Sequence, residues 1–391
     1  MADLLTADGL AQLHKVAAGH VGADQVPGLV VLVGRGGQVH AEALGSLTIG
    51  GPAVQRDSLF RIASMTKPVT GVATLALAAE GLFRLDEPVD RLLPELANRR
   101  VLRQMAGPLD DTVSAHRAII VRDLLNYTFG FGDEWAMFSA AEPWPVMAEQ
   151  SRLRLATLGP PDLAHQPDPD TWIAGLGSLP LLAQPGERWF YNTSASVLGV
   201  LCARATGQPF GDVLRSRVFE PLGMRDTGFW TTETSRLATE YEPAAGGLRV
   251  WDEPAGIFSQ PPPFGDGAAG LLSTADDLLA FSRMLLRGGA PVLAADAVAE
   301  MTRDQLTPEQ KSYGGLGPGF FDAASWGYSV AVVTAGERAG AFGWAGGFGS
   351  TWLADPARDL TVLVLTQRMF DGPGGHPLHD EVQAAAYAAL G

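Results

Sequence analysis

The amino-acid sequence is poor in cysteine and in lysine. Among 391 residues there is one cysteine, Cys202, and there are three lysines, while 43 acidic residues against 28 basic ones give a net charge of −15. A single cysteine excludes an internal disulfide and a metal site made of several cysteines. The negative charge would repel a phosphate backbone or an anionic membrane, and no basic cluster offsets it. We therefore expect neither a nucleic acid nor a membrane as partner.

Long apolar runs are also lacking. No stretch approaches the roughly 20 apolar residues of a transmembrane helix, and the start, MADLLTADGLAQLHKVAAGH, has neither the basic residues nor the long apolar core of a secretion signal. We therefore expect a cytoplasmic protein. Glycine and proline are frequent, with 47 and 27 residues, but they are spread along the chain, so no low-complexity segment is predicted. The length suits one large core or two closely packed subdomains.

Hydrophobic patterns place strands at both ends of the chain and helices between them. A β-hairpin is predicted over residues 29–43, and further strands begin at Ser350 and Leu360. Helices are predicted over residues 4–22, 65–81 and 376–390, and from Ser273 or Thr274 onward. This order indicates one sheet domain built from residues 1–85 and 265–391 and a mostly helical domain over residues 86–264.

One of the three lysines, Lys67, follows Ser64 by three residues in the small, apolar stretch LFRIASMTKPVTGVATLALAAEG. Pro68 is tolerated only in the first turn of a helix, which places Ser64 at the helix N-terminus. Residues three apart lie on the same helix face, so Lys67 can reach the Ser64 hydroxyl. In apolar surroundings a lysine loses its proton more readily and can act as a base. An alternative stays open here, in which Ser64 only caps the helix and Lys67 points to solvent.

Other catalytic signatures are missing from the sequence. The nearest approach to a Gly-x-Ser-x-Gly nucleophile elbow, at residues 327–331, lacks the last glycine. There is no phosphate loop and no dinucleotide-binding glycine pattern. The segment with His376, His379 and Asp380 has a faint metal-binding look, but it offers no third distant ligand, and a helix start at the surface is the better interpretation. We therefore expect no metal and no cofactor.

Two further segments complete a pattern with Ser64-Met-Thr-Lys67. Residues 185–199 read PGERWFYNTSASVLG, and residues 342–356 read FGWAGGFGSTWLADP. In this order and spacing the three segments resemble the serine β-lactamase and penicillin-binding superfamily. The likeness is strongest to its esterase branch, the family VIII carboxylesterases related to class C β-lactamases. It extends over nearly the whole chain, through residues 121–130, 220–229 and 267–277.

The resemblance implies an α+β fold of the β-lactamase/transpeptidase type, with a central antiparallel sheet flanked by helices, a mostly helical domain and the active site between them. It implies a small-molecule ester as substrate and leaves the oligomeric state open. By motif, Ser64 is the nucleophile, Lys67 the neighbouring base and Tyr191 the tyrosine of the second motif. Trp344, Ala345 and Gly346 replace the third motif, and the backbone N–H groups of Ser64 and Gly347 form the oxyanion hole.

These residue types suit ester hydrolysis through an acyl-enzyme. A serine hydroxyl is a weak nucleophile until a base takes its proton, and Lys67 and Tyr191 can share that proton. A tyrosine next to a lysine ammonium is expected to have a lowered pKa. Two fixed N–H donors would stabilise the oxyanion that forms on attack, each contributing about 3 kcal/mol.

The chain also departs from the lactamase pattern. Thr193 stands where the lactamases have an asparagine, and Trp344 stands where the third motif carries a cation. In the lactamases that asparagine and that cation help to bind the β-lactam. Because this chain lacks both, short-chain or aromatic esters are the expected substrates. An apolar substrate pocket is expected to be lined by Phe129, Phe131, Trp135, Trp189 and Trp344. A β-lactamase or D-alanyl peptidase, an acyltransferase with the same residues, and a non-catalytic binding protein are the alternatives.

Overall fold

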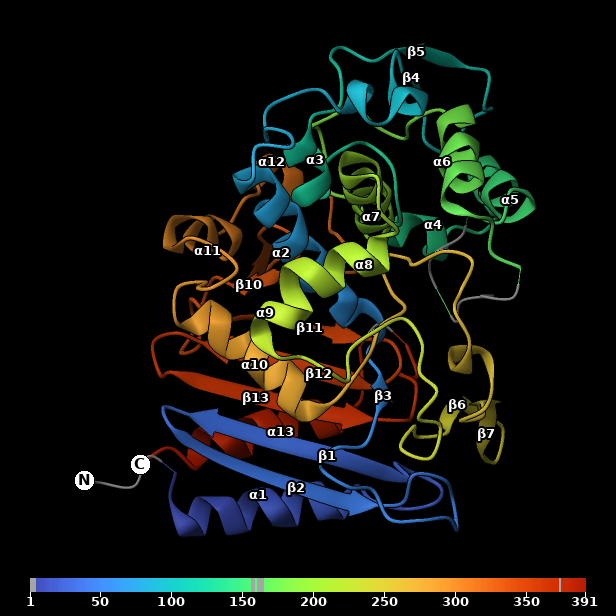
Figure 1. Cartoon of the computed structure of the whole chain (residues 1–391). Helices are drawn as coiled ribbons and strands as arrows, with labels where there is room; N and C mark the ends of the chain where they lie inside the picture. Colours follow the sequence, from blue (N-terminus) through green and yellow to red (C-terminus); the bar gives the residue numbers. More distant parts are fainter. Residues whose placement is uncertain (1–4, 156–158, 160–164, 373) are drawn as a thin grey trace.

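The computed structural model describes residues 5–155, 159, 165–372 and 374–391. Its centre is a seven-stranded antiparallel sheet with the strand order β2-β1-β13-β12-β11-β10-β9 (Figure 1). The strands are β1 (Gly28–Arg35), β2 (Gln38–Gly45), β9 (Ala324–Trp326), β10 (Ala331–Val333), β11 (Phe342–Gly346), β12 (Ser350–Asp355) and β13 (Leu360–Thr366). Because β1 pairs with β13 from Leu29 to Arg35, the two ends of the chain form one sheet. The predicted fold class is therefore confirmed.

Both faces of the sheet are covered, which explains why β1 is apolar throughout rather than alternating. Leu29, Val31 and Val33 pack in the apolar cluster that contains α1 (Ala7–Gly19) and α13 (Pro377–Ala388). Val30 and Leu32 belong to the main core on the opposite face. In Figure 1 α1 and α13 lie below and behind the long strands, and the remaining helices lie above them.

The main core is built around a buried helix, α2 (Thr66–Ala79), which packs against α7 (Thr193–Thr206). Thr274 caps α10 (Ala275–Leu286) by accepting the backbone N–H of Asp277, as the sequence predicts. The other α-helices of the described chain are α3 (Val121–Leu125), α4 (Trp135–Ser139), α5 (Pro145–Arg152), α6 (Pro169–Ser178), α8 (Phe210–Leu214), α9 (Glu220–Leu222), α11 (Ala295–Met301) and α12 (Pro308–Ser312).

Three two-stranded sheets were not anticipated from the sequence. They pair β3 (Phe60–Arg61) with β8 (Leu272–Ser273), β4 (Arg100–Leu102) with β5 (Thr112–Ser114), and β6 (Glu240–Ala244) with β7 (Gly247–Asp252). The middle of the chain therefore contains strands as well as helices. The main core runs across both expected domain boundaries, at residues 85 and 264, so this division remains a prediction.

Membrane-spanning helices were sought over the described ranges of the chain, and none there is long and apolar enough to cross a bilayer.

Candidate active site

Ser64 lies in a 3₁₀ turn, Ala63–Met65, that leads directly into α2. The preceding Ala63 has φ 42°, in the left-handed region that residues with a side chain rarely adopt. Strand β3 feeds this turn, and the N–H of Ile62 donates to the carbonyl of Leu271. The tight turn leaves Ser64 half-buried, whereas Lys67, in the first turn of α2, is fully buried. The helix-start position predicted for Ser64 is therefore confirmed.

The buried amine of Lys67 lies between two oxygen atoms. Its Nζ is 2.9 Å from Ser64 Oγ and donates to the carbonyl oxygen of Ala268 at 2.7 Å. Burial lowers the pKa of Lys67 from 10.5 to about 7, and the carboxyl groups of Asp266 and Asp133 act in the opposite direction. The alternative in which Lys67 points to solvent is excluded by this geometry. Burial thus favours the uncharged amine, which is the form that can accept a proton from the neighbouring Ser64 hydroxyl.

Tyr191 enters the site from the segment before α7. Its backbone pairs with that of Asp133 through two N–H···O hydrogen bonds, of 2.9 and 2.8 Å. The phenol oxygen accepts a hydrogen bond of 2.8 Å from the indole N–H of Trp344, and Lys67 Nζ lies 4.6 Å from the centre of the ring.

The predicted lowering of the Tyr191 pKa is wrong. Burial raises the pKa of Tyr191 above its usual value of 10, although the neighbouring Ser64 and Trp344 act in the opposite direction. The amine of Lys67 faces the ring of the tyrosine, and the desolvation of the phenolate outweighs the effect of the polar neighbours. At neutral pH, Tyr191 therefore keeps its proton, and Lys67 is the group that can lose one.

Strand β11 forms the wall opposite the start of α2. Gly346 abuts the turn before the nucleophile, because a Cβ atom there would collide with the carbonyl oxygen of Ile62. Gly347 is exposed, and among the described residues other than Gly347 and its two chain neighbours no heavy atom lies within 4 Å of the place where its Cβ would be. Trp344 and Ala345 are half-buried on the same strand. The backbone of Gly347 is thus held near Ser64 with open space in front of it.

Aromatic side chains surround Tyr191 and Trp344, and the sequence analysis missed most of them. The ring centroid of Trp326 lies 4.7 Å from that of Trp344 and 6.2 Å from that of Tyr191. The ring centroid of Phe320 lies 6.4 Å from that of Trp344 and 5.4 Å from that of Trp189, and Phe321 also packs against Trp189. We define the aromatic wall as Tyr127, Trp189, Phe320, Phe321, Trp326 and Trp344.

The residues predicted to line the substrate pocket separate into two groups. Phe129 and Phe131 have no exposed surface and belong to the main core, so they serve packing rather than the group around Tyr191. Trp135 is 40% exposed. Its backbone N–H donates to the carbonyl of Gly315, and its ring lies against Gly317, in the loop that leads to the aromatic wall. Thr193 is buried at the start of α7, and its hydroxyl has no hydrogen-bond partner within the described part of the chain.

Two buried acids next to Lys67 were also missed. Burial raises the pKa of Asp133 to about 7, and it raises the pKa of Asp266 above 3.8, while Lys67 lowers both values. Asp133 and Asp266 are 66 and 199 residues from Lys67 along the chain, and no local spacing signals that they converge on it. Their proximity is produced only by the tertiary fold.

The histidines near the C-terminus have structural contacts. His376 caps α13 by accepting the N–H of Leu378, and His379 is hydrogen-bonded to Thr351.

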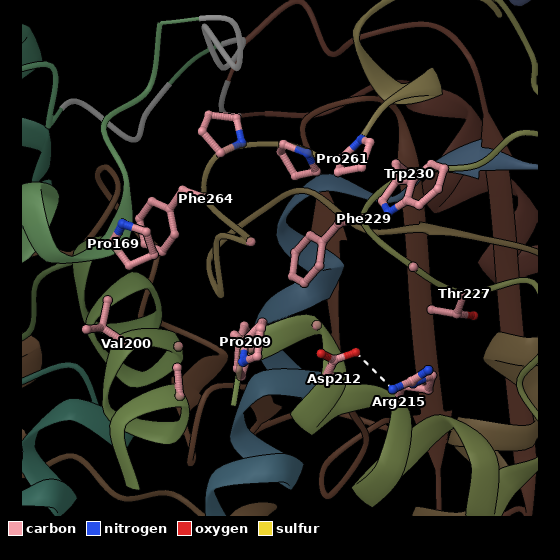
Figure 2. A pocket seen from close by; sticks show the side chains of 18 of the residues that line it. Pro169, Val200, Pro209, Asp212, Arg215, Thr227, Phe229, Trp230, Pro261 and Phe264 are labelled. Atoms are coloured by element: carbon pink, nitrogen blue, oxygen red, sulfur yellow. Dashed lines mark hydrogen bonds and ion pairs between the residues drawn. The ribbon is translucent and has the colours of Figure 1, made fainter. Parts of the chain in front are cut away.

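A cavity of about 700 Å³ opens between α7, α8 and the loops around residues 227–230 and 261–265 (Figure 2). Phe229, Trp230 and Phe264 line it, together with the ion pair of Asp212 and Arg215. Its lining reaches Gly265, one residue before Asp266, but it includes neither Ser64 nor Lys67. It is therefore distinct from the group around the serine.

Comparisons with known proteins agree with this geometry. Residues 13–387 match the sequence profile of the Beta-lactamase family. Protein Rv1367c from Mycobacterium tuberculosis (strain ATCC 25618 / H37Rv) is 38% identical over 336 residues, which cover 82% of this chain and 80% of that protein. Esterase EstB from Burkholderia gladioli is 32% identical over 384 residues, which cover 92% of this chain and 91% of EstB.

Among solved structures, EstCE1, described as a hydrolase with promiscuous acyltransferase activity, superposes with a TM-score of 0.78. It is 26% identical to this chain, and the match covers 97% of this chain and 99% of EstCE1. The chain therefore belongs to the β-lactamase family, as a serine hydrolase of the family VIII carboxylesterase branch that its motifs predict.

Proposed function

We propose that this protein is a carboxylesterase that hydrolyses short-chain or aromatic esters through an acyl-enzyme on Ser64. One observation carries the proposal: Ser64 Oγ lies 2.9 Å from the amine of Lys67, whose pKa burial lowers to about 7. A serine hydroxyl with a neutral base at hydrogen-bond distance is the arrangement that nucleophilic catalysis needs.

Acylation begins when the Ser64 proton passes to the neutral amine of Lys67. Ser64 Oγ bonds to the ester carbonyl carbon, and the electron pair of the C=O bond moves onto its oxygen. The backbone N–H groups of Ser64 and Gly347 stabilise this oxyanion. Gly347 suits this role because it has no side chain and faces open space, and its neighbour Gly346 fixes the strand against the turn before Ser64.

Tyr191 acts as a proton donor rather than as a phenolate. Collapse of the tetrahedral intermediate breaks the bond to the alcohol, whose oxygen takes the hydroxyl proton of Tyr191, and the ammonium of Lys67 returns a proton to Tyr191. The raised pKa of Tyr191 and the indole hydrogen bond from Trp344 both fit a phenol that is neutral between turnovers. Water then attacks the acyl carbonyl while Lys67 takes its proton. The bond between Ser64 Oγ and the acyl carbon breaks, the Lys67 ammonium returns that proton to Ser64 Oγ, and the carboxylic acid is released.

The aromatic wall favours neutral, apolar substrates. Half-buried Trp344, Phe320 and Phe321 offer apolar surface on the sheet side of Ser64, where lactamases place a cation. The arginines that flank these motifs are ion-paired, Arg188 with Glu134 and Arg368 with Asp371. Each charge-assisted hydrogen bond that a β-lactam carboxylate would miss costs about 1.5–3 kcal/mol.

The decisive experiment combines one variant with two substrates. Ser64→Ala should abolish hydrolysis of a short-chain p-nitrophenyl ester without lowering Tm, because only a half-buried hydroxyl is removed. In the wild type, kcat/KM for that ester should exceed kcat/KM for a chromogenic cephalosporin by at least about a hundredfold, as one to two lost charged contacts predict. Substantial esterase activity in Ser64→Ala would place the nucleophile elsewhere. Equal or greater efficiency on the cephalosporin would favour a β-lactamase.

Acyl transfer is a second candidate function, because EstCE1 is described as a hydrolase with promiscuous acyltransferase activity. The same acyl-enzyme would be attacked by an alcohol instead of water, with Lys67 taking the alcohol proton. If the half-buried members of the aromatic wall, Trp344, Phe320 and Phe321, hold an alcohol better than water, adding a simple alcohol to the ester assay should give a new ester as a major product. A product ratio that follows only the molar ratio of alcohol to water would leave hydrolysis as the function.

A further inference from the structure

Asp266 is a buried acid that the reaction scheme does not yet use. It lies in the segment between Phe264 and β8, and it is 6% exposed. One of its carboxylate oxygens accepts the backbone N–H of Ala268 at 2.9 Å. The carbonyl of that same Ala268 accepts the hydrogen bond from Lys67 at 2.7 Å. The carboxylate is therefore linked to the amine of Lys67 through one residue.

We propose that Asp266 is a positioning residue, which fixes the Ala268 carbonyl against Lys67 and supplies the negative charge that keeps the lysine basic enough to take the Ser64 proton. The inference rests on the proposed function and adds a residue to it. Two effects are combined in one side chain: a hydrogen bond that orients the carbonyl, and an electrostatic field at the amine. They can be separated by the choice of substitution.

Burial is the largest influence on Asp266 and raises its pKa, but several polar neighbours favour its carboxylate form. Gln166 and the hydroxyl of Ser196 lie beside the carboxyl group and favour its ionised form, as do the N–H of Ala268 and the charge of Lys67. Against them stands the burial of the group, which raises its pKa. An amine and a carboxyl group that are buried together stabilise each other's charged forms, because the low dielectric strengthens their attraction.

The other titratable groups around Lys67 come from three further segments. Asp133 faces it from the segment before α4, and Tyr191 from the segment before α7. Tyr127, after α3, faces Tyr191 and Asp266, and burial raises its pKa, so it is neutral at working pH. Asp133 is thus a second carboxyl group that acts on Lys67, although burial raises its pKa to about 7, and its backbone bonds serve Tyr191 rather than Ala268.

The test is the pH dependence of kcat/KM for a p-nitrophenyl ester. In the wild type, kcat/KM should rise with pH through an apparent pKa near 7, because the neutral form of Lys67 is active. Asp266→Asn keeps an oxygen for the Ala268 N–H but removes the charge. The acidic limb of its kcat/KM profile should move to lower pH by about one unit, because the pKa of Lys67 falls when the negative charge is lost. The kcat/KM at the plateau should fall about three- to tenfold, because Lys67 is then a weaker base.

Two further variants and one control complete the design. Asp266→Ala should show the same pH shift with a lower plateau, because the hydrogen bond to Ala268 is lost as well. Ser196→Ala should shift the limb in the same direction by a smaller amount, and it tests the inference if the Asp266 variants do not fold. Asp277→Asn is the matched control: Asp277 is another buried acid that accepts backbone and hydroxyl hydrogen bonds, but it does so from Asp226 and Thr227. It should leave the pH profile unchanged.

The outcomes distinguish this inference from the proposed function. The inference is overturned if hydrolysis depends on Ser64 but Asp266→Asn keeps the wild-type acidic limb, because Asp266 then has only a structural role. If Asp266→Asn does not fold, the same outcome in Ser196→Ala overturns it. A limb that moves to higher pH would overturn it as well. If Ser64→Ala retains the activity, the proposed function itself fails, whatever the Asp266 variants do.

Discussion

The two ends of the seven-stranded sheet differ in length and in role. At one end β1 and β2 have 8 residues each and β13 has 7, and residues of β1 and β13 are buried on both faces. At the other end β11 has 5 residues, and β10 and β9 have 3 each. Trp344 of β11 and Trp326 of β9, on the short end, reach the candidate active site. The long strands supply most of the sheet's buried apolar surface, whereas the short ones position reactive and binding groups.

This difference teaches that stability and activity should respond to different substitutions. The long strands pair in an unbroken register, from Leu29 opposite Thr366 to Arg35 opposite Leu360. The short end instead carries Trp326 and the half-buried Trp344, whose rings lie beside Tyr191, and the exposed Gly347 follows β11. Substitutions at the two ends therefore give a direct way to test the comparison.

Lys67→Met should have the largest effect on activity of the substitutions considered. The amine is replaced by an uncharged side chain of similar length, so the base is lost and kcat/KM should fall by about a thousandfold or more. The stability of the folded protein should increase instead of falling. The folded-state pKa of Lys67, about 7, lies below its unfolded value of 10.5, so burial of the amine destabilises the protein most at low pH and progressively less as pH rises from 7 to 10.5.

Tm measured across this pH range should therefore be higher in Lys67→Met than in the wild type, with the gap widest below pH 7. A Tm that falls equally at all pH values would show that the amine stabilises the fold.

Leu363→Ala should show the reverse behaviour. Leu363 is fully buried on β13, opposite Leu32 on one side and Trp352 on the other. Removing this side chain should cost about 2–5 kcal/mol of stability, measured by denaturant unfolding, because a cavity is left in the main core. The value of kcat/KM per folded molecule, counted by titration with a covalent serine inhibitor, should stay within about twofold. A loss of activity per labelled site would show that the long strands also control the site.

Tyr191→Phe should lower kcat by roughly a hundredfold, because the leaving oxygen loses its proton donor. The ring contacts with Trp189, Trp326 and Trp344 are retained, so Tm should change little. The acidic limb of the pH profile should stay near pH 7, because Lys67 still sets it. If the limb disappears together with the activity, Tyr191 rather than Lys67 is the titrating base.

Trp344→Phe should give the smallest effect. It removes the indole hydrogen bond to Tyr191 but keeps an aromatic ring, so kcat should fall about three- to tenfold, as one neutral hydrogen bond predicts. Trp326→Phe is the matched control, because the indole N–H of Trp326 has no partner within the described part of the chain. Equal losses in the two variants would assign the effect to ring packing.

The sequence predicts the parts of this molecule that are local. The hairpin of β1 and β2, the helix after Ser64 and the Thr274 cap follow from periodicity and from proline and cap chemistry over a few residues. The serine–lysine contact follows from the geometry of one helical turn. The strands β9 and β10 have too few residues to show any period, so the sequence did not reveal them.

What depends on distant contacts was missed or misjudged. Asp133 and Asp266 meet at Lys67 only in the folded protein. The direction of the Tyr191 pKa shift depends on how deeply the phenol is buried, and motif spacing carries no information about that depth. Phe129 shows the same limit, because an apolar residue near a motif can face the core or the substrate, and here it faces the core.

The close approach of Gly346 to Ile62 has a consequence for how substrate preference can diverge among relatives. The spacing between the strand that carries Gly347 and the turn that carries Ser64 is set by one backbone lying against another, with no side chain between them. Neighbouring side chains, such as those of the aromatic wall, can then be exchanged without changing the separation of the two N–H donors. The backbone contact thus fixes the geometry around the reacting carbonyl, whereas the side chains that would contact the rest of the ester can vary.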